Sequence, residues 1–282
     1  MRTKIFWEIS NYCTAQCSYC PSKYWEGEQP KSITDYLRVT QRIIDHYQLL
    51  GRTIDWTFSG GEPLEMFDFP SLLKLCKEHN GTIDLTTNGG KLWLDWWAVE
   101  PNIDSLHLTY HYWQNPNLIK FIVQTFTAKN KPFDVMVPIR VNEFDEDMTR
   151  ATEIEQATGI QVTRRPLYVT FDTNMGLVNY TVPQLTRLFG EDWVRQNVTD
   201  KPALTFGERH IKLVQESPVF TGRLCNVGIE KLNISATGSV SGSNCNTAHL
   251  GSIWGAMELP NGPQPCKMQA CTSFDDQQIT KF

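Results

Sequence analysis

The sequence lacks the features that mark membrane, secreted and low-complexity proteins. No apolar run approaches the roughly 20 residues that a membrane-spanning helix requires. The first residues carry neither the apolar core nor the small-residue cleavage site of a signal peptide. Repeats and low-complexity tracts are also missing. These absences predict a globular, cytoplasmic protein that does not associate with a membrane.

The sequence also lacks any segment in which charges of one sign are concentrated. The chain has 26 basic and 31 acidic residues, a net charge of −5, and no long block of like charges. Non-specific binding to DNA or RNA requires a basic footprint, so no nucleic-acid partner is expected. The local pair Arg164-Arg165 is interpreted as solvated or ion-paired.

Patterns typical of strands and helices alternate regularly between residues 4 and 166. Expected strands cover residues 4–10, 53–59, 82–87, 105–110, 133–139 and 161–166. Expected helices cover residues 32–50, 71–79, 92–99, 117–129 and 145–158. This βα rhythm predicts an α/β protein with a parallel sheet, arranged as an open or partial barrel of the (β/α)6 TIM type.

After Pro166 the rhythm breaks. Short helices are expected over residues 181–189 and 192–197, and a hairpin over 231–234 and 239–241. We expect a barrel domain over residues 1–215 and a small cysteine-rich hairpin and helix domain over 216–282. Because the second domain has few core residues, a bound metal is expected to stabilise it.

Eight cysteines require an explanation, because reducing compartments disfavour structural disulfides. Cys76 stands alone in a helical pattern and is expected to be a core residue. The others gather near the two ends of the chain, at Cys13, Cys17, Cys20, Cys225, Cys245, Cys266 and Cys271. This clustering predicts two metal sites.

Cys13, Cys17 and Cys20 have the spacing C-x3-C-x2-C. Three thiolates on one tight loop can bind three irons of a cubane cluster and leave the fourth iron open to a ligand. A structural zinc site would require a fourth ligand, and a ferredoxin-like carrier would require four cysteines. The spacing therefore favours a catalytic iron–sulfur cluster.

A second motif, Gly60-Gly61-Glu62-Pro63, closes the second expected strand. Two glycines let a backbone approach a ligand closely, and Glu62 offers a carboxylate to a cationic amine. The alternative interpretation is a tight turn between a strand and a helix.

The cysteine loop, its lead-in 8–12 and the glycine motif together resemble the radical S-adenosylmethionine (SAM) superfamily. The resemblance implies a partial (β/α)6 barrel, SAM as a cofactor, and a 4Fe–4S cluster on the three N-terminal cysteines. It also implies that the backbone of Tyr19 lies near the adenine of SAM. Gly60, Gly61 and Glu62 would then contact the amino group of the SAM methionine moiety.

Further correspondences lie at the ends of expected strands, where parallel barrels place their active sites. The resemblance makes Asn88 a ligand contact, Thr109 a neighbour of the SAM ribose and Arg140 a bidentate partner of the SAM carboxylate. His111 is a candidate to face the substrate. An ordinary loop or packing role is the alternative for each of them.

The superfamily implies a reaction as well. One electron from the reduced cluster cleaves SAM, and the resulting 5′-deoxyadenosyl radical abstracts hydrogen from a substrate carbon. The cofactors perform the difficult step, while the protein positions groups and excludes water and oxygen. An electron donor of the flavodoxin or ferredoxin type is the implied partner.

Four cysteines in the C-terminal part suffice for one fully ligated 4Fe–4S cluster. The stretch from Cys225 through Gly238 to Cys245 resembles the SPASM and twitch extensions of radical SAM enzymes, and the low cysteine count fits the shorter twitch form. Six residues separate Gly238 from Cys245, and Cys266-x4-Cys271 is not a standard closing pair. These departures leave open which cysteines ligate. Zinc bound by the same four thiolates is the alternative.

A fully ligated second cluster implies electron transfer, and hence a radical SAM oxidoreductase acting on a small, sugar-like molecule. If only three cysteines ligate, the cluster binds substrate and the spare thiol donates hydrogen, as in an epimerase. Modification of a ribosomal peptide is a further possibility. The first strand begins near Met1, which leaves no room for an N-terminal recognition domain, so a separate recognition protein would be required. A non-catalytic module stabilised by zinc is the third hypothesis.

Overall fold

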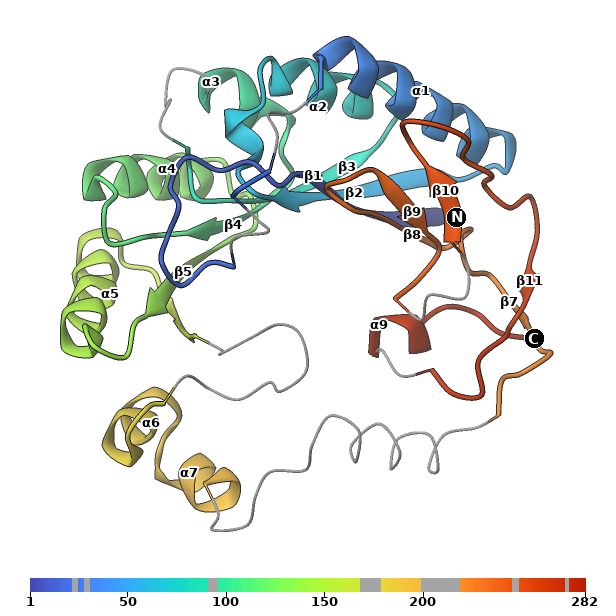
Figure 1. The fold of residues 1–282 in the computed structure, drawn as a ribbon. Helices are drawn as coiled ribbons and strands as arrows, with labels where there is room; N and C mark the ends of the chain where they lie inside the picture. The colour runs from blue at the N-terminus through green and yellow to red at the C-terminus, as the bar shows by residue number, and fades with distance from the viewer. Residues whose placement is uncertain are drawn as a thin grey trace. The chain divides into compact units, whose positions relative to one another are not determined.

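The computed structural model describes residues 1–21, 25–27, 31–90, 96–167, 179–198, 219–244, 249–271 and 274–282 (Figure 1). The chain forms two compact units: Met1–Leu106 with Leu213–Phe282, and His107–Lys212. The C-terminal segment therefore shares a compact unit with the first part of the chain. The expected domain division at residue 215 stays a prediction.

A sheet forms the centre of the first unit. Its strands follow the order β10 (His249–Ser252), β9 (Ser239–Ser241), β8 (Lys231–Ile234), β1 (Arg2–Ser10), β2 (Thr53–Gly60) and β3 (Thr82–Thr87). β1 pairs in parallel with both β2 and β8, and β2 pairs in parallel with β3. The C-terminal hairpin thus extends the N-terminal sheet, with Lys4 opposite Lys231 and Trp7 opposite Ile234.

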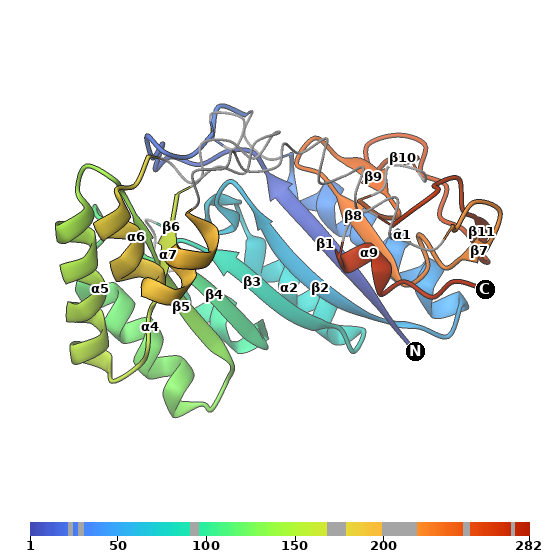
Figure 2. The ribbon, with the colours of Figure 1, turned by 90° about the horizontal axis from the view of Figure 1, so that it is seen from below.

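The helices of the first unit include α1 (Ile33–Leu49) and α2 (Phe69–Glu78), which lie along one face of β1, β2 and β3 (Figures 1 and 2). Ser32 caps α1 by accepting the Asp35 N–H, and Gly51 ends it with a φ of +65°. The shorter elements of this unit are η2 (Pro63–Glu65), α3 (Trp96–Val99), η3 (Glu100–Asn102), β7 (Leu224–Cys225), β11 (Gln264–Pro265) and α9 (Phe274–Gln277).

The core lies between these helices and the sheet. Along β1, Ile5, Trp7 and Ile9 are buried, while the residues between them point to the opposite face. Trp7 packs against Trp56 and Phe58 of β2, with ring centroids 6.3 and 6.0 Å apart. Each fully buried large side chain contributes about 1.5–3 kcal/mol to stability. Cys76 on α2 is fully buried, as expected.

The second unit repeats the strand and helix alternation. β4 (Ser105–Thr109) contains the division between the units. The elements that follow are α4 (Pro116–Ala128), β5 (Phe133–Ile139), α5 (Phe144–Thr158), β6 (Thr163–Pro166), α6 (Val182–Phe189) and α7 (Glu191–Asn197). β5 and β6 pair in parallel, with Met136 opposite Thr163.

The α/β class with parallel strands and intervening helices is confirmed. The expected elements agree with the structure within a few residues, and the expected helix over 92–99 is described from Trp96 onward. The sequence patterns missed β7, β10, β11 and α9, because elements of two to four residues depend on tertiary contacts and have no periodic pattern of their own. None of the helices in the described ranges is both long and apolar enough to cross a membrane.

Candidate functional site

Cys13, Cys17 and Cys20 lie on the loop that directly follows β1. Cys17 is buried, and the other two are half-buried. The Cys20 N–H donates to the Cys17 carbonyl at 2.9 Å, which closes a turn between these two cysteines. The indole Nε1 of Trp25 donates to the Cys20 carbonyl at 3.0 Å. Tyr19 is half-buried beside Cys20.

Gly60 and Gly61, at the end of β2, pack against the backbone that leads into this loop. The Gly61 N–H donates to the Ser10 carbonyl at 2.7 Å, and the Glu62 N–H donates to the Tyr12 carbonyl at 2.9 Å. A Cβ on Gly61 would lie 2.2 Å from the Tyr12 oxygen, and one on Gly60 would lie 2.4 Å from the Ser10 oxygen. Gly60 also has a φ of +118°. Glycine is therefore required here by contact within the chain itself.

The carboxylate of Glu62 is buried, with 1% of the residue exposed. It accepts the N–H groups of Leu64 at 2.9 Å and Asn88 at 2.8 Å, and the hydroxyl of Thr87. Burial raises the pKa of Glu62 to about 7, and these hydrogen bonds oppose the shift. Its contacts thus anchor the end of β3 to the loop after β2. Contact with an amine of SAM stays a prediction.

Two further side chains hold Cys13 and its neighbour. Asn88 Nδ2 lies 3.8 Å from Cys13 Sγ. Glu65 accepts the Thr14 N–H at 2.9 Å and the Thr14 hydroxyl at 2.5 Å. The sequence-based prediction included Asn88 but missed Glu65. The available signal was a second carboxylate one helical turn after Glu62.

The environment of these thiols favours their protonated form when no metal is bound. Burial is the main reason why the pKa of Cys13 rises to about 11, and Glu62 and Glu65 raise it further. The pKa of Cys20 rises to about 11 through burial and the nearby Cys17. Thiolates in such surroundings require a positive charge, which iron ions supply.

No three His, Cys, Asp or Glu side chains converge as ligands of a single ion in the part of the chain that the structure describes. A cubane cluster presents three separate irons to its three thiolates. Its ligands therefore have no need to converge on one point.

Two predicted residues lie at the end of β4 in the second unit. Thr109 is the last residue of that strand, and His111 follows shortly after it. The His111 ring stacks on Trp113, with centroids 5.7 Å apart and planes at 4°. Burial lowers the pKa of His111 to about 4, so the ring is neutral at neutral pH. The roles assigned to both residues stay predictions.

Arg140 follows β5 and already has a carboxylate partner. Its Nε donates to Asp147 Oδ2 at 2.9 Å, and its Nη2 donates to Oδ1 at 2.8 Å. Asp147 is buried and also accepts from Arg150 at 2.7 Å. The Arg140 guanidinium lies 4.1 Å from the centroid of the Tyr112 ring. One bidentate edge of Arg140 is thus used within the protein, and its contact with SAM stays a prediction.

Three of the four predicted C-terminal ligands lie close together in the first unit. Cys225 on β7 and Cys266 after β11 are buried in one small cluster. Burial raises the pKa of Cys225, and the neighbouring Cys266 and Cys271 raise it further. The Cys271 thiol donates to the Asp276 carbonyl at 3.8 Å. Cys245 lies outside the described residues.

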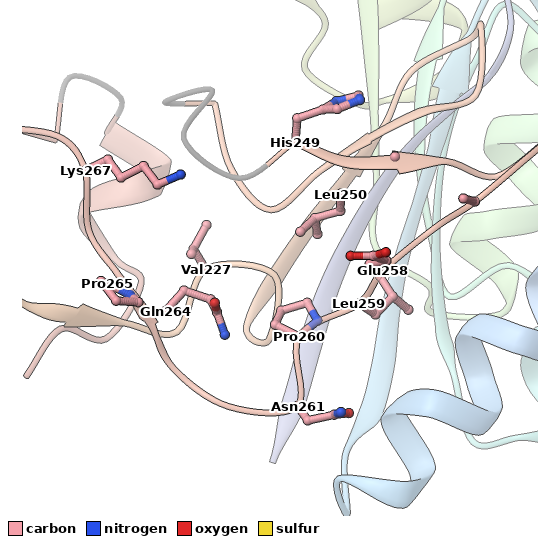
Figure 3. Close-up of a pocket in the computed structure, with 12 residues that line it drawn as sticks. Val227, His249, Leu250, Glu258, Leu259, Pro260, Asn261, Gln264, Pro265 and Lys267 are labelled. Atoms are coloured by element: carbon pink, nitrogen blue, oxygen red, sulfur yellow. The ribbon is translucent and has the colours of Figure 1, made fainter.

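A cavity of about 640 Å³ lies in the C-terminal part of the first unit (Figure 3). Its wall combines apolar side chains, such as Leu250, with the polar groups of His249 and Glu258. Pro265 and Lys267, the residues on either side of Cys266, also line it. The cavity therefore borders the backbone of the C-terminal cysteine group, and no motif in the sequence indicates it.

Known proteins share the fold of this chain. Residues 7–136 match the family model described as the Radical SAM superfamily. No curated protein matches the chain. SuiB of Streptococcus suis bound to S-adenosylmethionine is similar with a TM-score of 0.52 and 15% identity, over 90% of this chain and 64% of SuiB. The chain thus spans less than two thirds of the length of SuiB.

A second similar structure is anSMEcpe with bound AdoMet and the Cp18Cys peptide. The TM-score is 0.51 at 16% identity, over 91% of this chain and 79% of anSMEcpe. At these identities the two structures support the fold. The segment matched by the family model contains the cysteine loop, the glycine motif and Asn88. Residues 7–136, a little under half of the chain, are therefore similar to the Radical SAM superfamily.

Proposed function

We propose that the chain is a radical SAM enzyme that oxidises a small, polar, sugar-like molecule. The observation that carries the radical SAM assignment is the cysteine loop after β1, which packs on Gly60 and Gly61 and is contacted by Asn88. Three thiols, a close backbone contact and a side-chain amide meet at the carboxyl ends of parallel strands. Parallel barrels place their reactive groups at this end of their strands.

In this proposal Cys13, Cys17 and Cys20 hold a 4Fe–4S cluster. SAM is bound with the help of Tyr19, Gly60, Gly61, Glu62, Asn88, Thr109 and Arg140. When bound, the two cofactors supply a one-electron cleavage that gives a 5′-deoxyadenosyl radical. The protein fixes the loop through Glu65 and Thr14 and aligns the ends of β2 and β3 through Glu62. In this proposal the neutral His111 faces the substrate.

The oxidative outcome rests on the C-terminal cysteines. Cys225, Cys266 and Cys271 lie close together, and with Cys245 they would complete the ligands of an auxiliary 4Fe–4S cluster. A fully ligated cluster has no open iron for a substrate, so it would accept an electron from the product radical. A flavodoxin or ferredoxin would supply the electron that starts the reaction. A cytoplasmic location is part of the same proposal.

Modification of a peptide is the second candidate function. It is favoured by the similar structures, since SuiB was also solved with its precursor peptide SuiA, and anSMEcpe with the Cp18Cys peptide. Both similarities cover about nine tenths of this chain. A peptide substrate would require no change in the assignment of the cysteine loop.

The test begins with anaerobic reconstitution and counting of iron and sulfide. Two clusters predict about eight irons per chain. The reduced enzyme is then incubated with SAM and either small polyhydroxylated molecules or peptides, and 5′-deoxyadenosine is quantified. Substrate-dependent 5′-deoxyadenosine from only one set identifies the substrate class. Two zinc ions per chain with almost no iron would overturn the enzyme assignment.

A further inference from the structure

The Asn88 side chain lies directly after β3, where it meets the sulfur of Cys13. The distance between Nδ2 and Sγ is 3.8 Å, within hydrogen-bonding range for a sulfur acceptor. Asn88 is only 7% exposed, so this amide is largely shielded from water. A hydrogen bond in such surroundings has more influence than one at the surface.

The orientation of this amide is fixed by its other contacts. Asn88 Oδ1 accepts the Gly90 N–H at 2.8 Å, so the carbonyl end of the amide is held by the following turn. The donor end, Nδ2, is therefore the end that faces the sulfur. The Asn88 backbone N–H donates to Glu62 Oε2 at 2.8 Å, and the Thr87 hydroxyl also donates to Glu62. Buried Glu62 thus holds the turn that carries Asn88.

A thiolate that ligates iron remains a hydrogen-bond acceptor. Donors to ligand sulfurs stabilise the reduced cluster more than the oxidised one, because reduction adds negative charge to the iron–sulfur unit. Groups outside the ligand set thereby tune the potential of a metal site. Asn88 has the position and the orientation for this role.

We propose that Asn88 raises the reduction potential of the N-terminal cluster by donating a hydrogen bond to the Cys13 thiolate, with Glu62 as the residue that positions Asn88. This inference rests on the proposed function, in which Cys13 is a cluster ligand. It gives Asn88 a role toward the cluster that is separate from any contact with SAM.

The test is an anaerobic redox titration of the full reconstituted chain, followed by electron paramagnetic resonance. Only the signal that changes on addition of SAM is used, which separates this cluster from one bound by the C-terminal cysteines. Asn88→Leu removes the donor while keeping the same branching of the side chain, and Asn88→Asp replaces it with an acceptor of negative charge. We expect the midpoint potential to fall from wild type to Asn88→Leu, and further to Asn88→Asp.

Asn102→Leu is the matched control, because the Asn102 amide bonds the Ala98 carbonyl on the surface of the same unit. The midpoint potential of the N-terminal cluster in Asn102→Leu should equal that of the wild type. An Asn88→Leu enzyme that carries the cluster at an unchanged potential would overturn the inference. A purely structural role would lower iron content or Tm without moving the potential. Failure of the wild type to bind a SAM-responsive cluster would instead contradict the proposed function.

Discussion

Gly61 has no room for a side chain, because the Tyr12 carbonyl occupies the position next to its Cα. The sequence predicted that the two glycines serve a close approach of the backbone to a ligand. The contact that the structure shows is with the lead-in to the cysteine loop. That partner lies some 50 residues earlier in the chain, so the local sequence could indicate a close approach but could not identify what approaches.

Gly61→Ala should displace the cysteine loop and lower stability by about 1–3 kcal/mol, a cost typical of overpacking. Iron content after reconstitution and the free energy of unfolding check this expectation. Gly255→Ala is the control, because no atom beyond its own chain neighbours lies within 4 Å of a Cβ at that position. Normal iron content and stability in Gly61→Ala would show that the contact is unimportant.

Glu62 gives a pH dependence with a defined sign. Its pKa in the folded protein is about 7, above the ordinary value of 4.5, so the folded state binds its proton more tightly. The contribution of protonated Glu62 to the free energy of unfolding is therefore present at low pH and is lost as the pH rises through 7. In metal-free protein, the stability of wild type relative to Glu62→Gln should fall by on the order of 3 kcal/mol between pH 4.5 and 8.

Urea unfolding at several pH values measures this difference. Glu78→Gln serves as the surface control, since the Glu78 side chain is 57% exposed. A flat difference for Glu62→Gln would mean that Glu62 ionises freely in the folded protein. A difference that increases with pH would reverse the assigned direction of the shift.

At the scale of elements, β5 and α5 are joined by the pairing of Arg140 with Asp147. The sequence placed Arg140 at a strand end but offered no sign of its partner seven residues later. The local sequence does not predict that Asp147 is buried, because helix periodicity alone does not distinguish a buried acidic residue from an exposed one. The structure shows Asp147 1% exposed, between Arg140 and Arg150.

Asp147→Ala should lower the free energy of unfolding by about 3–5 kcal/mol, because it leaves two arginines without their buried partner. Glu146→Ala is a matched control on the same helix. It removes a surface pair between Glu146, whose side chain is 62% exposed, and Arg150. The loss should lower the free energy of unfolding by only about 0–1 kcal/mol. Equal effects of the two substitutions in chemical denaturation would contradict the buried pairing.

At the scale of the molecule, the C-terminal segment joins the N-terminal part in one compact unit. The βα rhythm predicted the strands and helices of residues 4–166 well, because each has a periodic pattern of its own. The hairpin over 231–234 and 239–241 was also predicted. Its parallel pairing with β1 was not, since strand partners distant in sequence leave no local pattern. Likewise, cysteine count predicted a second site without showing which thiols meet.

Replacing Cys225, Cys266 and Cys271 together with alanine should remove about four of the eight irons and retain SAM cleavage. The reason is that these thiols lie apart in sequence from the cysteine loop and form a separate group. Iron analysis and 5′-deoxyadenosine assays check both parts. Cys76→Ala removes a fully buried cysteine from α2 and should leave the iron content unchanged. A full complement of iron in the triple variant would exclude the C-terminal cluster.

The most direct test replaces Cys13, Cys17 and Cys20 with alanine and measures reductive SAM cleavage under anaerobic conditions. The triple variant should form no 5′-deoxyadenosine above background, while Cys76→Ala should cleave SAM like the wild type. Near-wild-type cleavage by the triple variant would show that the N-terminal thiols do not hold the reactive cluster, and would contradict the assignment of radical chemistry to the cysteine loop.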